Sequence, residues 1–372
     1  MAAGVEAGLA DQLDAVTGFQ SVPGGSLRPL SRITLREARP QGSNQPTAAG
    51  VAAVEEQFRL ADSLAPGDLA LCLLSGGGSA LLPAPVEGIS LADKQEVTRL
   101  LHASGATIDE MNCVRKHLSR FKGGRFAQRL VERGVAVLSL ILSDVVGDPL
   151  DVIASGPTAP DPSTFIDALA VLDRFGLRAQ VSSSVIRHLE RGDAETPKSL
   201  PGSVTNTVLV NNAGALAAAA TRAESLGYRV VDLGSFIEGE TRHVANVFAD
   251  ILRGLRSPAV LLSGGETTVT LGPTPGKGGR NQEFVLACLV RLGLGHIGDA
   301  VILSAGTDGE DGPTDAAGAI GDRETLIKAL GWNIQGHLDR HDAYPFFDAT
   351  GDLLRTGLTQ TNVMDVRVML VR

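Results

Sequence analysis

Short apolar runs alternate with helical patterns along most of the chain, and this alternation limits the folds open to it. The runs expected to form strands are residues 69–74, 135–142, 207–210, 229–233, 259–262, 300–304 and 366–371. The helical patterns cover residues 89–104, 110–119, 165–175, 185–190, 213–226, 240–255, 283–292 and 325–330. A strand followed by a helix usually returns to the same sheet, so the pattern predicts an α/β protein with mainly parallel or mixed sheets flanked by helices.

One polar stretch interrupts this pattern near the middle of the chain. Residues 190–204 read ERGDAETPKSLPGSV and are rich in charge and proline, which is typical of a linker. A chain of 372 residues is also long enough for two domains. We therefore expect one α/β domain over residues 1–200 and a second over residues 205–372.

Charge and cysteine usage restrict the function. The formal net charge is −9, which argues against a nucleic-acid partner because phosphate backbones require a basic surface. No apolar run approaches the roughly 18 residues of a membrane span, and the first residues do not resemble a signal peptide. The three cysteines are far apart and form no CxxC motif, so we expect a cytoplasmic protein.

Glycine and acidic residues gather directly after the predicted strands. The chain has 44 glycines, and many lie in four loops, residues 75–79, 143–148, 263–266 and 306–312. Ligands of open α/β sheets bind at the carboxyl ends of the strands. These loops therefore mark the expected site.

The first loop is a candidate phosphate-binding loop. Its residues are Ser75, Gly76, Gly77, Gly78 and Ser79. Small residues let backbone N–H groups approach an anion, although a tight turn without a ligand remains the alternative. The loop is not a Walker A motif, no GxGxxG follows a strand, and Ser79 lacks the GxSxG context of a hydrolase.

The acidic loops offer candidate magnesium ligands. These are Asp144, Asp148, Asp308 and Asp311. Mg²⁺ in enzymes is commonly held by one or two carboxylates, waters and substrate phosphates. The alternative is that each aspartate caps a helix or stabilises a turn.

Basic residues beside glycines are candidate anion ligands. They lie in Arg115-Lys116, in residues 122–125 and in residues 277–283. Arg280 is suited to bind a carboxylate or phosphate through two parallel hydrogen bonds. Solvated loop charges are the alternative, and the histidines show no metal-binding spacing.

Several long motifs together resemble the glycerate 2-kinase family, whose second half is the MOFRL domain. They are LLSGGGSALLPAP, GATIDEMNCVRKHLSRFKGGRFAQ, LSLILSDVVGDPLDVIASGPT, LLSGGETTVT, GKGGRNQEF, GTDGEDGPTDAAGA and TGLTQTNVMD. The resemblance extends from about Pro46 to Arg372.

The resemblance implies a cytoplasmic kinase that converts ATP and D-glycerate to ADP and 2-phosphoglycerate with Mg²⁺. It implies a Rossmann-like first domain, a MOFRL second domain and an active site in the cleft between them, and it leaves a homodimer open. By motif position, Ser75–Ser79, Asn112 and Arg115 would bind the nucleotide. Arg280 and Lys116 would stabilise charge, Asp308 and Asp144 would serve the substrate hydroxyl or the metal, and Asp311 would bind metal.

The start of the chain departs from the family pattern. Members usually begin with a strand and a loop of the form VVGxGKA, followed by a helix that contains MAAA. Here MAAGVE resembles the inside of that helix, and the spacing of Leu9, Leu13 and Val16 predicts a helix over residues 1–16. Because the loop lysine of this pattern is not found here, one alternative is a catalytically impaired nucleotide-binding homologue. A hydroxypyruvate reductase, a name given to similar sequences, is another.

Overall fold

The computed structural model describes residues 1–40 and 45–372, which divide into two compact units. Unit 1 comprises Met1–Ile141 and Asp148–Leu209, and unit 2 comprises Leu142–Gly147 and Val210–Arg372. The chain therefore passes from one unit to the other three times. Residues 142–147, which carry Asp144, belong to unit 2 although the flanking chain belongs to unit 1.

Unit 1 contains two small sheets. Strand β1 (Gly18–Pro23) pairs in parallel with β2 (Ile33–Arg39). The second sheet has the order β3-β4-β5, with β3 (Leu69–Leu74) parallel to β4 (Ala136–Leu142) and β5 (Val204–Val210) at its edge. This confirms the three strands predicted for this region. The sequence analysis missed β1 and β2.

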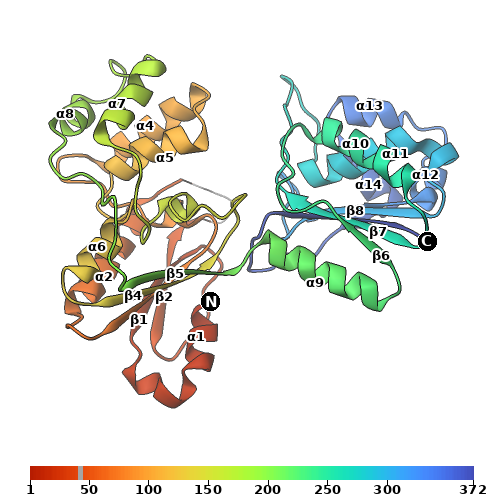
Figure 1. The fold of residues 1–372 in the computed structure, drawn as a ribbon. Helices are drawn as coiled ribbons and strands as arrows, with labels where there is room; N and C mark the ends of the chain where they lie inside the picture. Colours follow the sequence, from red (N-terminus) through yellow and green to blue (C-terminus); the bar gives the residue numbers. More distant parts are fainter. Residues whose placement is uncertain (41–44) are drawn as a thin grey trace. The chain divides into compact units, whose positions relative to one another are not determined.

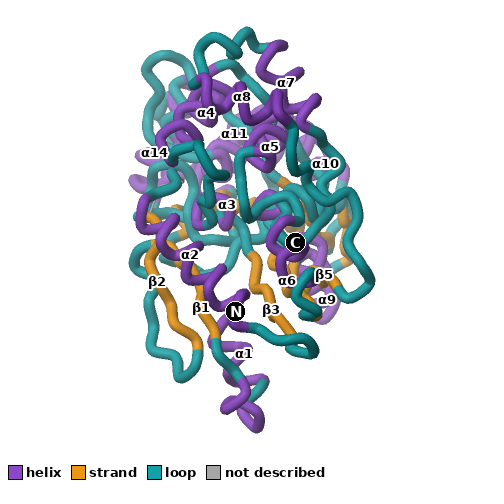
Figure 2. The backbone as a smooth tube through the Cα atoms, turned by 90° about the vertical axis from the view of Figure 1, so that its left-hand side faces the viewer, coloured by secondary structure: helices purple, strands orange, loops and turns teal. Residues whose placement is uncertain are grey.

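The helices of unit 1 fall into two groups. Helices α2 (Ala48–Ser63) and α6 (Arg125–Val131) pack on the second sheet through Ala61, Leu130 and Val137. The others form a helical layer with its own core at one end of the unit, and Figures 1 and 2 both show them together. They are α4 (Leu91–Ala103), α5 (Ile108–His117), α7 (Phe165–Arg174) and α8 (Ser183–Arg191).

Short helical turns complete unit 1. The helix predicted over residues 1–16 is interrupted, because α1 (Ala2–Gly8) is followed by the 3₁₀ turn η1 (Ala10–Ala15). Helix α3 (Gly78–Leu81) follows β3, and the 3₁₀ turn η2 (Ile153–Ser155) follows β4. Helix α4 begins with a capping box, in which the Ser90 side chain accepts the Asp93 N–H.

Unit 2 is built on one mixed six-stranded sheet with the order β10-β9-β8-β11-β7-β6. Strand β6 (Arg229–Asp232) is parallel to β7 (Ala259–Gly265). Strand β11 (Asp365–Val371) lies antiparallel between β7 and β8 (Ala300–Gly306). The antiparallel edge is completed by β9 (Gly318–Gly321) and β10 (Leu353–Leu354). The two units thus confirm an α/β fold with parallel and mixed sheets.

Helices cover both faces of this sheet (Figure 1). Helix α9 (Asn212–Ser225) covers one face through Leu216, which packs with Val260 and Leu262. The other face carries α10 (Thr241–Gly254), α11 (Arg280–His296), α12 (Arg323–Lys328), α13 (Ile334–Asp339) and α14 (Ala343–Thr350). Helix α11 is the central one, because its residues 281–289 are all buried.

The described residues contain no helix that is both long and apolar enough to cross a membrane.

Candidate active site

The glycine loop of unit 1 forms a tight turn between β3 and α3. The Gly78 N–H donates to the Ser75 carbonyl at 3.2 Å, and Gly77 has a φ of 69°, which favours glycine. The turn places Ser79 in the single turn of α3. The predicted residues Ser75–Ser79 therefore form one compact turn. Ser79 makes side-chain hydrogen bonds to residues from other parts of unit 1.

Two basic side chains converge on Ser79. Arg115 from α5 and Lys122 from the loop before α6 both donate short hydrogen bonds to Ser79 Oγ. Lys122 Nζ also donates to the Ser79 carbonyl oxygen at 2.8 Å. The predicted residues Ser79 and Arg115 thus lie together, and Lys122 joins them.

Ser155 and Asn112 continue this network. Ser155 Oγ lies 3.0 Å from Ser79 Oγ and donates to Asn112 Oδ1 at 3.0 Å. Ser155 and Ala154 have φ values of 61° and 52°, which non-glycine residues seldom adopt. Backbone strain of this kind often occurs at functional sites, where the surrounding structure fixes a side chain in place.

The cluster in unit 1 carries basic groups without a matching acid. Among the described residues, no carboxylate forms an ion pair with Arg115 or Lys122, and the Lys122 residue is only 2% exposed. Burial, together with the nearby charges of Arg115 and Lys94, holds the pKa of Lys122 well below its usual range. Burial also lowers the pKa of Arg115. An anionic ligand would fit such a cluster.

Lys116 has a different environment from its neighbour Arg115. Its amino group lies 3.0 Å from Asp151 Oδ2 and 3.2 Å from Asp161 Oδ1, and the residue is buried. Two carboxylates thus surround one ammonium group. No direct contact joins Lys116 to Ser79 in the described structure, and its role in stabilising phosphoryl charge stays a prediction.

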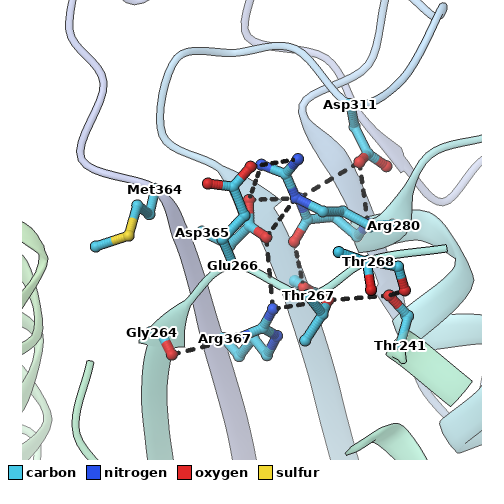
Figure 3. Close-up of polar contacts among 12 residues, drawn as sticks. Thr241, Gly264, Glu266, Thr267, Thr268, Arg280, Asp311, Met364, Asp365 and Arg367 are labelled. Atoms are coloured by element: carbon cyan, nitrogen blue, oxygen red, sulfur yellow. Dashed lines mark hydrogen bonds and ion pairs between the residues drawn. The ribbon is translucent and has the colours of Figure 1, made fainter. Parts of the chain in front are cut away.

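Arg280 is the first residue of α11 and is held by carboxylates in unit 2 (Figure 3). Its Nε and Nη2 donate to the two oxygens of Asp365 at 2.7 and 3.0 Å, and Nη1 lies 2.9 Å from Glu266 Oε1. Burial alone would lower the pKa of Arg280, but the hydrogen bonds that it donates to Asp365, together with the carboxylate charges, outweigh burial and raise the pKa. The guanidinium is therefore fixed in place and permanently charged.

Asp365 is the centre of this ion-pair network. It is fully buried at the start of β11, and it also accepts a hydrogen bond from Asn281 Nδ2 at 2.9 Å. Arg367 lies 3.4 Å from the same carboxylate and 3.2 Å from Thr267 Oγ1 (Figure 3). Sequence analysis did not select Asp365, because an aspartate at the start of a strand has no distinctive spacing.

Asp311 caps the N-terminus of α11. Its two oxygens accept the backbone N–H groups of Asn281 and Gln282 at 3.0 and 2.9 Å. A Cβ atom at Gly279 would lie 2.3 Å from the Asp311 carboxyl carbon, so glycine permits this close packing. Burial raises the pKa of Asp311 to about 6. Asp311 thus has the capping role that was its alternative, and its metal role stays a prediction.

Asp144 and Asp308 are carboxylates of unit 2, and the charge of Asp308 affects the pKa of Asp144. Burial, followed by the charges of Glu266 and Asp308, raises the pKa of Asp144 to about 6. Asp144 contacts Asn362 Nδ2 at 3.4 Å, and Asp308 accepts the Glu310 N–H at 3.0 Å. The described residues contain no group of three or more metal-ligating side chains. Two carboxylates that influence each other are nevertheless a donor set that suits Mg²⁺, which takes its other ligands from water and phosphate.

Two family models match the chain. One, described as a domain of unknown function (DUF4147), matches residues 1–190, and the MOFRL family model matches residues 259–365. The glycerate kinase of Macaca fascicularis is 40% identical over 93% of this chain and 99% of its own length. The glycerate 2-kinase of Pyrococcus horikoshii is 38% identical over 97% of this chain and 83% of its own length.

A solved structure and one differently named relative add to these matches. The crystal structure of glycerate kinase from Thermotoga maritima has a TM-score of 0.90 and 38% identity, covering 100% of this chain and 88% of that one. A protein of Agrobacterium vitis, described provisionally as a hydroxypyruvate reductase, is 42% identical over 100% of this chain and 84% of its own length.

Proposed function

The chain belongs to the glycerate 2-kinase family, and from this premise we propose that it transfers the γ-phosphoryl group of ATP to the 2-hydroxyl of D-glycerate. The products are ADP and 2-phosphoglycerate. The observation that carries this proposal is the match over the whole chain to the Thermotoga maritima glycerate kinase. The free state of all three cysteines is in keeping with a cytoplasmic enzyme.

Unit 1 binds phosphate through the loop of Ser75–Ser79, together with Asn112 and Arg115. This assignment is supported by the basic cluster around Ser79, in which no carboxylate of the described part of the chain pairs with Arg115 or Lys122. Lys116 has a supporting role, because its pairing with Asp151 and Asp161 fixes the chain beside Arg115.

Arg280 stabilises the negative charge of the transferred group. Phosphoryl transfer depends mainly on positioning and charge neutralisation, so a rigid guanidinium is well suited to it. Its orientation is maintained by the two hydrogen bonds to Asp365. Arg367 contacts the same carboxylate and helps to hold it in place.

Asp144 and Asp308 divide the acidic roles. Asp144 would hold Mg²⁺, which when bound neutralises phosphate charge and orients the reacting oxygens. Asp308 accepts the proton of the substrate hydroxyl late in the transfer, as a general base does. The charge that Asp308 and Glu266 exert on Asp144 supports placing these carboxylates together.

The test is an assay of the chain with ATP, Mg²⁺ and D-glycerate. Release of ADP that depends on D-glycerate supports the kinase, and NMR of the product separates 2-phosphoglycerate from 3-phosphoglycerate. The name of the Agrobacterium vitis relative makes hydroxypyruvate reduction the second candidate. Oxidation of NADH or NADPH with hydroxypyruvate, without ATP turnover, would reject the kinase proposal in favour of the reductase.

A further inference from the structure

Lys122 is a buried lysine that pairs with no acidic residue among residues 1–40 and 45–372. It is 2% exposed, and its amino group donates to neutral oxygens, namely Ser79 O, Ser79 Oγ and Ser155 Oγ. Buried charges in proteins are normally paired with an opposite charge. Lys116, six residues earlier, follows that rule with Asp151 and Asp161, so the exception at Lys122 is local.

The surroundings of Lys122 make the imbalance larger. Arg115 donates to the same Ser79 hydroxyl, so two basic groups share one oxygen. Lys94, buried on α4, donates to the Leu118 carbonyl at 3.0 Å and adds charge of the same sign. Neutral acceptors satisfy the hydrogen bonds of these groups but do not balance their charge.

The hydrogen-bond directions show how the site would respond to an anion. A hydroxyl oxygen has two lone pairs, and those of Ser79 are used by Arg115 and Lys122. Ser155 uses its own proton to donate to Asn112, so Ser79 donates its proton to Ser155. The Ser79 hydroxyl thus accepts from two basic donors and connects the buried Lys122 to Arg115, whose side chain is only half-buried.

We propose that Arg115 binds an oxyanion in unit 1, a carboxylate or a phosphate, and that Lys122 acts through the Ser79 hydroxyl, to which Arg115 also donates, as the buried positioning residue of this site. The identity of the oxyanion rests on the proposed function: it is the carboxylate of D-glycerate or a phosphate of ATP. The existence of the site does not depend on that function. A bound anion supplies the missing negative charge and favours the protonated form of Lys122.

This role predicts an unusual effect of removing the amino group. A lysine kept for structure, such as one in an ion pair, destabilises the protein when it is replaced. Lys122→Met removes a buried polar group that has no counter-charge, so the ligand-free variant should melt at the same temperature as the wild type or higher. The same variant should lose its response to anions.

The experiment measures thermal melting of the full chain with inorganic phosphate, D-glycerate, or ATP without Mg²⁺. The variants are Lys122→Met, Lys122→Arg and Ser79→Ala, with Lys198→Met as an exposed-lysine control in the same unit. We expect Lys122→Met and Ser79→Ala to weaken anion binding at least tenfold. Lys122→Arg should restore most of it, and Lys198→Met should bind as the wild type does.

The choice of anion identifies the source. Weakening confined to D-glycerate assigns the site to the substrate carboxylate, and the KM for D-glycerate should rise with little change in kcat. Weakening confined to phosphate and ATP assigns it to the nucleotide. Either result supports the site, even if the wild-type chain fails to phosphorylate D-glycerate. That failure would reject the proposed function and leave the anion site standing.

Two results overturn the site. One is a Lys122→Met variant that melts at a lower temperature and binds all three anions as tightly as the wild type. The other is a wild-type chain whose melting temperature responds to none of them.

Discussion

Lys94 is the residue whose titration gives the clearest pH dependence of stability. Burial, then the charges of Arg115 and Arg120, lowers its pKa to about 7 from a usual 10.5. Between these values the folded chain binds fewer protons than the unfolded chain, so this residue makes stability rise with pH by up to about 1.4 kcal/mol per pH unit. Lys94→Met should remove that slope. The variant's free energy of unfolding, compared with that of the wild type, should therefore be more favourable at pH 7 than at pH 10.

Urea denaturation at several pH values checks this prediction. The variant Lys198→Met serves as the control and should keep the wild-type slope, because Lys198 is a largely exposed lysine. Parallel pH profiles for the wild type and Lys94→Met would contradict the assignment.

Arg280 should matter for turnover far more than for folding. Removing a donor that stabilises transition-state charge lowers kcat by about 10²–10³-fold, so we expect a loss of this size in Arg280→Ala. Arg280→Lys should recover little, because lysine cannot form the paired hydrogen bonds to Asp365. The measurement is steady-state ADP release.

A control lies on the same helix. Arg291 pairs with Asp250 at the surface, where such bridges contribute little, so Arg291→Ala should keep wild-type kcat. Equal turnover of Arg280→Ala and Arg291→Ala would remove Arg280 from the site.

Sequence patterns identified several residues of the candidate site but not the residues with which they interact. Ser79, Asn112 and Arg115 were predicted and lie in one network. The sequence could not show which of Lys116 and Lys122 is paired with acidic residues, because both lie near other basic residues. Only the folded chain shows that Lys116 has carboxylate partners. Asp365 was missed for a related reason, since its role arises from its position beside α11.

At the scale of elements, the start of α11 connects stability to the site. Asp311→Ala removes the acceptor of two backbone N–H groups, and loss of an N-cap costs about 1–2 kcal/mol. Because Arg280 is the first residue of this helix, we expect kcat to fall as well. Urea denaturation and ADP release measure the two effects.

Asp322 provides the matched cap. It caps α12 by accepting the Thr325 N–H at 3.0 Å. Asp322→Ala should lose stability to a similar extent and keep its turnover. A loss of turnover as large as that of Asp311→Ala would show that destabilisation alone explains both variants.

Elements with a strong apolar signal could be predicted, and exposed ones could not. Strand β3 was predicted with its observed bounds, and β4 to within one residue, because both are continuous apolar runs. Strand β2 carries several exposed polar side chains, and β10 is two residues long, so neither has a clear period. The Ser-Gly-Gly of residues 263–265, expected in a loop, lies inside β7, because β11 pairs with it.

At the scale of the whole molecule, the main part of unit 2 should fold without unit 1. Residues 210–372 contain the six strands of its sheet and the helices on both faces. We therefore expect this fragment to show helical and strand circular dichroism and one cooperative urea transition. It lacks residues 142–147 and hence Asp144, so it should have no kinase activity.

A fragment of residues 210–364 is the comparison, because it differs only by the removal of β11. It should lack the cooperative transition, since β7 and β8 then have no strand between them. A non-cooperative fragment 210–372 would instead mean that unit 2 depends on the rest of the chain.

The central place of β11 also has a consequence for biosynthesis. The ribosome makes β7 and β8 about 100 and 60 residues before β11, so two partial sheets with open edges must wait for it. The last strand then joins these partial sheets and delivers Asp365 to Arg280 in the same event. A chain released early would therefore carry exposed strand edges for chaperones to bind and no ordered arginine, so an incomplete product is both recognisable and inactive.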